Sequence, residues 1–130
     1  MTPASGFDRE GFLRDWFAEW APAKPIYGWA TELLVHLIED EPEVAWGLIL
    51  ALIERAPGGE SLSWVAAGPL EDLLCRHGPD LIDRVEALAA ADSRFKECLG
   101  GVRGSDRMDP SVHERVCAAA PGGRASHERA

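Results

Sequence analysis

The chain has 130 residues, 46% of them hydrophobic and 27% charged, which is enough for one domain with a hydrophobic core. Its 22 acidic and 13 basic residues give a net charge of −9, which argues against binding to nucleic acid or to an anionic membrane. Three cysteines without CxxC spacing argue against a disulfide framework or a zinc ribbon. The sequence opens without a secretory signal pattern, so we expect a cytoplasmic protein.

Helical patterns fill the first half of the chain. Asp8 is a predicted cap for a first amphipathic helix that ends near Pro22, and a second helix is expected from Tyr27 to Glu39. A third helix begins at Pro42 and continues through VAWGLILALI, a run that is apolar on every side. A helix without a polar face is expected at the centre of the fold, and this run is far shorter than the roughly 18 residues of a membrane span.

A Gly-Pro pair interrupts the next helical pattern. A short helix that starts near Glu60 is predicted to break at Gly68, because proline disfavours helical geometry at the preceding residue and glycine tolerates almost any geometry. Pro69 then begins a new helix, in which Leu70 faces inward. Glu71 falls in the first turn of that helix, where the helix dipole stabilises a carboxylate.

A second Gly-Pro pair follows ten residues later. His77 and Gly78 are predicted to end the helix, the first with a favourable imidazole and the second with a left-handed cap. Further helices are expected from Pro79, from about Ser93, and from Pro110. No alternating strand pattern is present.

These patterns predict an all-α fold with a single helical domain over residues 1–120 and a flexible tail over residues 121–130. Six or seven helices with short connections are expected to pack as antiparallel hairpins. Two arrangements remain open: a short solenoid of the HEAT type, or a compact irregular bundle, since no internal repeat is evident.

The sequence offers few motifs that carry chemistry. His113 and Cys117 lie one helical turn apart, in a run similar to the zincin HExxH motif, but no further ligands stand at a recognisable spacing. No Gly-x-Ser-x-Gly turn and no phosphate-binding loop is found. We therefore predict no catalytic, metal or cofactor site and a protein that is not an enzyme.

Aromatic and acidic residues are the candidates for partner binding. Tryptophans anchor many protein interfaces, and an acidic rim attracts a basic partner. The predicted partner-binding residues are Trp29, Glu39, Asp40, Glu41, Glu43, Trp64, Glu71 and Asp72. The carboxylates in this set are better interpreted as helix caps and solvated corners, whereas the two tryptophans are equally well interpreted as core residues.

A Gly-Pro-Leu-Glu motif lies within the block from residue 45 to 101. The positions that match include Gly68, Pro69, Leu70 and Glu71, followed by His77 and Gly78. With this motif the block resembles a small bacterial domain family of unknown function. The resemblance implies a helical fold and no assigned activity. The family carries a tryptophan soon after the position of Gly101, where this chain has Val102.

Three functions are compatible with the sequence. The leading hypothesis is a non-enzymatic protein-binding module, in particular an immunity or inhibitor protein that covers a basic partner with an acidic surface. The second is a small-ligand binder or enzyme with a pocket at the Gly68-Pro69 corner, where Glu71 and His77 would supply polar groups. The third is a homodimeric scaffold that buries the tryptophan-rich face.

Overall fold

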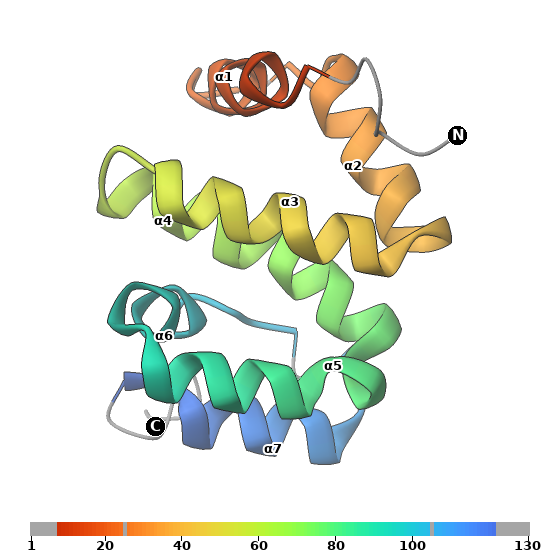
Figure 1. Ribbon diagram of the computed structural model, residues 1–130, viewed down its shortest axis with the longest axis vertical. Helices are drawn as coiled ribbons and strands as arrows, with labels where there is room; N and C mark the ends of the chain where they lie inside the picture. Colours follow the sequence, from red (N-terminus) through yellow and green to blue (C-terminus); the bar gives the residue numbers. More distant parts are fainter. Residues whose placement is uncertain (1–7, 25, 105, 122–130) are drawn as a thin grey trace.

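The structure is a computed structural model that describes residues 8–24, 26–104 and 106–121; these form seven α-helices, one π-helical segment and no strand (Figure 1). The helices are α1 (Arg9–Trp20), α2 (Trp29–Asp40), α3 (Pro42–Arg55), α4 (Gly59–Val65), the π-helical segment η1 (Ala66–Leu70), α5 (Glu71–Ala91), α6 (Ser93–Leu99) and α7 (Pro110–Ala119). The predicted all-α single domain is confirmed. Residues 122–130 of the predicted tail lie outside the described part of the chain.

The helices stack in three layers (Figure 1). The first layer holds α1 and α2, the second α3 with α4, and the third the latter part of α5 with α7. Each of α1, α2, α4, α5 and α6 packs against α3. Because Ala45, Ile49 and Leu52 are fully buried, the predicted central position of this helix is confirmed.

The third layer contains a parallel pair of helices that are not neighbours in the sequence. Gly78 lies against Val112, and further along both helices Glu86 pairs with Arg115, so α5 and α7 run in the same direction. Helix α6 and the loop residues 100–104 and 106–109 lie between α5 and the start of α7 (Figure 1). A parallel pair of helices packed side by side needs such a connection.

The predicted break at Gly68 is wrong. Backbone angles remain helical on both sides, with φ −64° and ψ −49° at Ala66 and φ −66° and ψ −45° at Leu70. Pro69 has no N–H with which to continue the α-helical ladder. Instead the N–H of Glu71 donates to the carbonyl of Ala66, five residues back, and the helix passes the proline in a π turn.

The helix changes direction at the second Gly-Pro pair instead. His77 has non-helical angles of φ −131° and ψ 19°, and Figure 1 shows the chain turning back beyond this point. The predicted left-handed cap at Gly78 is wrong, since Gly104 is the only described glycine with positive φ. Gly78 is buried against α7, where an added Cβ would lie 2.8 Å from Cγ1 of Val112.

Candidate functional site

An open groove of about 270 Å³ lies between the first layer and the π-helical segment. We call it the Gly68 groove; its lining includes Trp16, Trp20, Tyr27, Val35, Gly68 and Arg107. These residues come from α1, the segment before α2, the middle of α2, the π turn and the loop before α7. The second hypothesis from the sequence expected a pocket at this corner, and the structure has a groove there.

Stacked aromatic rings form one wall of the groove. The ring centroids of Trp16 and Trp20 lie 5.2 Å apart at an interplanar angle of 20°. Those of Trp20 and Tyr27 lie 5.1 Å apart at 30°. Trp16 is buried whereas Tyr27 is 58% exposed, so the stack leads from the core to the surface. The wall of the groove is therefore built largely from the carbon atoms of stacked rings.

Gly68 faces this wall from the π turn. An added Cβ at Gly68 would lie 3.4 Å from Cη2 of Trp20, an ordinary van der Waals contact. A longer side chain would have to occupy the space beside the indole. The absence of a side chain at Gly68 therefore helps to keep the groove open.

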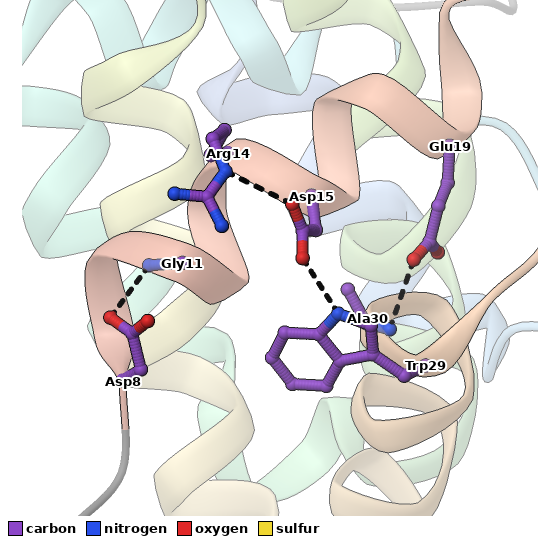
Figure 2. Close-up of polar contacts among 7 residues, drawn as sticks. All are labelled: Asp8, Gly11, Arg14, Asp15, Glu19, Trp29 and Ala30. Carbon is purple, nitrogen blue, oxygen red and sulfur yellow. Dashed lines mark hydrogen bonds and ion pairs between the residues drawn. The ribbon is translucent and has the colours of Figure 1, made fainter.

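Glu19 holds α1 and α2 together beside the groove (Figure 2). Its carboxylate accepts hydrogen bonds from the N–H groups of Ala30 at 3.1 Å and Thr31 at 2.9 Å, and from the Thr31 hydroxyl at 2.6 Å. The Trp20 indole N–H donates to the same hydroxyl oxygen at 3.1 Å. Burial tends to raise the pKa of Glu19, but these hydrogen bonds outweigh it and lower the pKa from its ordinary value.

Trp29, a predicted partner-binding residue, lies outside the groove lining. Its indole N–H donates to Oδ2 of Asp15 at 2.8 Å (Figure 2), and its ring packs edge-on against Phe12. The hydrogen bond from Trp29, followed by that from Arg14, lowers the pKa of the Asp15 carboxyl. Although half-exposed, Trp29 thus connects α2 to α1.

Unpaired carboxylates border the groove on α2. Glu32 and Glu39 lie three and four residues from Val35, so they flank this groove residue on the same side of the helix. The side chains of Glu32, Glu39, Asp40 and Glu41 make no ion pair or hydrogen bond with any residue that the structure describes. Their negative charge is therefore uncompensated locally.

Other predicted partner-binding carboxylates form ion pairs or hydrogen bonds with residues of the same chain. Glu43 forms a two-pronged ion pair with Arg84, at 2.8 and 2.5 Å. Glu71 is buried and accepts hydrogen bonds from the Arg103 N–H at 3.1 Å and from Nη2 of Arg107 at 2.9 Å. Glu71 thus holds the loop before α7 in place.

A negative and a positive side chain lie together at the far end of the groove. Asp72 and Arg107 line it together, with 3.9 Å between Oδ1 and Nη1, and Arg76 lies 3.5 Å from the same carboxylate. Glu71 and His77, the polar groups expected in a pocket at this corner, do not line the groove. The remaining predicted anchor, Trp64, is half-buried and packs against the core.

His77 instead connects two layers. Its Nε2–H donates to the carbonyl oxygen of Ile38 at 2.6 Å, near the end of α2. The last carbonyls of a helix have no partner within that helix, so this hydrogen bond satisfies one of them. His77 therefore interacts with the C-terminal end of α2, rather than with its own helix as predicted.

Possible nucleophiles and metal ligands form no recognisable centre in the described residues. His113 Nε2 lies 3.7 Å from Sγ of Cys117, but no group of three metal-binding side chains is found in the part of the chain that is described. Burial raises the pKa of the Cys98 thiol to about 12, so this cysteine stays protonated at neutral pH. None of the described helices is long and apolar enough to span a membrane.

Sequence reasoning missed much of the groove. Trp20 packs against the core and also lines the groove wall, a position that the sequence analysis did not identify. Tyr27, Val35 and Arg107 were not singled out, and Arg107 reaches the groove from a distant loop. The one available signal was the small residue at Gly68, which indicated the position of the groove but not the other residues that line it.

Comparison with known proteins identifies a family. A family model described as a family of unknown function (DUF6869) matches residues 20–123, a longer range than the block that resembled a family in the sequence. No curated protein and no solved structure matches the chain at a significant level. The matched range includes α2 to α7 and the whole π turn. The chain therefore belongs to DUF6869, a family of unknown function.

Proposed function

We propose that this protein is a non-enzymatic binding module that docks a basic segment of another protein on α2. The observation that carries the proposal is the distribution of exposed apolar side chains. Every exposed large hydrophobic residue in the described chain lies within ten residues: Ile26 at 75%, Tyr27 at 58%, and Trp29 and Val35 at 48% each. Concentrated apolar exposure is typical of a surface that another molecule covers.

Charge supports a basic partner. The same helix carries the unpaired Glu32, Glu39 and Asp40, and the chain as a whole has a net charge of −9. Such a field speeds the encounter with a positive partner and disfavours a negative one. An inhibitor that covers a cationic surface of its target would use both features.

Binding of a synthetic helical peptide made of leucine and lysine tests the proposal, with the lysines replaced by glutamate in a control peptide. We expect the lysine peptide to bind and its affinity to fall with added salt. The variant Glu32→Gln/Glu39→Gln/Asp40→Asn should bind about tenfold more weakly, from roughly 0.5 kcal/mol for each exposed ion pair.

The matched control is Asp80→Asn/Glu97→Gln/Glu114→Gln, which changes the net charge equally at exposed sites on α5, α6 and α7. This variant should retain most of the affinity. Equal losses in both variants, or binding that salt does not weaken, would contradict a docking surface on α2.

A small-ligand site in the Gly68 groove is the second candidate, because the groove lies where a pocket was expected. Its volume of about 270 Å³ is at the lower limit of pockets for small molecules, which span roughly 300–1,000 Å³. Its two charged residues, Asp72 and Arg107, lie close enough to neutralise one another. Both observations favour the first candidate.

The third candidate is a homodimer, in which two copies of the chain bury the exposed residues of α2 against each other. Light scattering over a range of concentrations measures it directly. A dimer that dissociates when Val35 is changed to Glu would show that this surface binds a second copy of the chain instead of another protein. A monomer at all concentrations is the outcome that we expect.

A further inference from the structure

We propose that the Gly68 groove receives one large apolar side chain from the partner segment, while lysine or arginine residues of that segment pair with Glu32 and Glu39. The inference rests on the proposed function and specifies what the partner must carry. It assigns Gly68 as the residue that determines whether the apolar side chain can enter.

The size of the groove matches one side chain. An apolar cavity of roughly 150 Å³ holds a molecule the size of benzene. The 270 Å³ of the Gly68 groove therefore accommodates a leucine or phenylalanine side chain with room for its approach. Burial of such a side chain should tighten binding roughly tenfold to a hundredfold, enough to serve as the main anchor of a short segment.

The lining selects for an apolar group. Trp20 donates its indole N–H to Thr31, whose hydroxyl in turn donates to Glu19. The wall thus directs its polar atoms to each other, and the carbon edge of the Trp20 ring lies toward Gly68 in the groove. A polar side chain placed against the rings would lose its bonds to water without a replacement.

The two glutamates set the spacing of the positive charges. Glu32 and Glu39 are seven residues apart, about 10.5 Å along the helix axis, and Val35 at the groove lies between them. A helical partner segment presents the same spacing when its basic residues lie three positions before and four positions after the anchor. The partner is therefore an amphipathic helix with an apolar residue between two basic ones.

Gly68 controls access to the space beside Trp20. A methyl group at Gly68 would lie at van der Waals distance from the indole. The larger side chain of leucine would therefore fill the space that the apolar side chain of the partner would occupy. Gly47 on α3 is a suitable control, because an added Cβ at that position meets nothing within 4 Å. Both glycines have negative φ, so a side chain is permitted at either position.

The test uses an alanine-based helical peptide with one central leucine and lysines three positions before and four positions after it. A second peptide has serine in place of leucine. We measure the dissociation constant of each peptide, and we follow the Trp20 indole N–H signal by NMR. We expect the leucine peptide to bind at least tenfold more tightly than the serine peptide and to shift the Trp20 signal.

Protein variants locate the anchor. Gly68→Leu should weaken binding of the leucine peptide at least tenfold, and Gly47→Leu should leave it unchanged. If Gly68→Leu fails to fold, Gly68→Ala takes its place with an expected loss of about threefold. Equal affinity for the two peptides with an unmoved Trp20 signal would overturn the anchor while leaving salt-dependent docking intact. Absence of salt-sensitive binding by either peptide would overturn the proposed function itself.

Discussion

Two Gly-Pro pairs, ten residues apart, affect their helices in opposite ways. At Gly68-Pro69 the helix continues through a π turn, whereas at Gly78-Pro79 the chain bends sharply at His77. The local chemistry of the pairs is the same, since both prolines lack the N–H for the helical ladder. The difference must therefore come from what surrounds each pair.

The first pair lies within a helix that packs against the core. Buried residues lie on both sides of it, with Val65 and Ala66 before and Leu70 and Leu73 after. A helix that continues buries both sets in one core. At the second pair, tertiary contacts hold the bend: His77 binds α2 and Gly78 touches α7. The comparison teaches that a Gly-Pro pair permits a break and that packing decides whether one occurs.

The largest effect is expected from Gly78→Ala. The added Cβ would lie 2.8 Å from Cγ1 of Val112, so α5 and α7 must move apart, at a cost of about 1–3 kcal/mol of unfolding free energy. Urea unfolding measures the loss. A second change, Val112→Ala, should remove the clash, so that the effect of Gly78→Ala becomes smaller in its presence. An undiminished effect in the double variant would locate the constraint elsewhere.

A smaller loss is expected from His77→Ala. Removal of the imidazole leaves the Ile38 carbonyl without its hydrogen bond, which costs about 1 kcal/mol. His36 on α2 is exposed, so His36→Ala serves as the control. If thermal unfolding shows the same stability for both variants, the histidine contact does not hold the bend.

Low pH is expected to destabilise the packing of α1 against α2, beside the first Gly-Pro pair. Glu19 has a lowered pKa in the folded protein, so the stability that it contributes is present above its ordinary pKa of 4.5 and is lost as the pH falls through the folded value. Unfolding free energy measured from pH 6 to pH 3 should fall less steeply for Glu19→Gln than for the wild type. Parallel curves would show that the carboxylate is not the responsible group.

The smallest effect is expected from Gly68→Ala. Its methyl group would meet Trp20 at 3.4 Å, which the structure tolerates, and alanine favours the helix. The change in unfolding free energy should stay within about 0.5 kcal/mol. A loss as large as that of Gly78→Ala would abolish the distinction between the two Gly-Pro pairs.

Local signals were reliable for the beginnings of α1, α3 and α7. Asp8 accepts a hydrogen bond from the Gly11 N–H (Figure 2), and Asp109 caps α7 in the same manner. Pro42 and Pro110 occupy the first turns of α3 and α7, as the sequence predicted. These features depend on residues close together in the chain, so short-range chemistry is sufficient to predict them.

Features that join distant segments could not be predicted in this way. Glu71 had the pattern of a surface carboxylate in a first turn, but the loop with Arg103 and Arg107 folds over it. The groove needs Trp20, Val35 and Gly68 from three separate elements. Nothing in the local sequence sets the distance between those elements, because helix packing determines it.

The π turn also bears on how the chain tolerates changes in length. Its hydrogen bond spans five residues, so this stretch of helix holds one residue more than an α-helical turn would. Deletion of Ala67 would bring the turn to α-helical length and keep Leu62 and Leu73 oriented toward the core, but Pro69 would then clash with the preceding turn, at a cost of about 3 kcal/mol. Elsewhere in a helix, the same deletion would rotate everything that follows by about 100°. The segment from residue 66 to 70 is thus a place where the chain can shorten without losing its register.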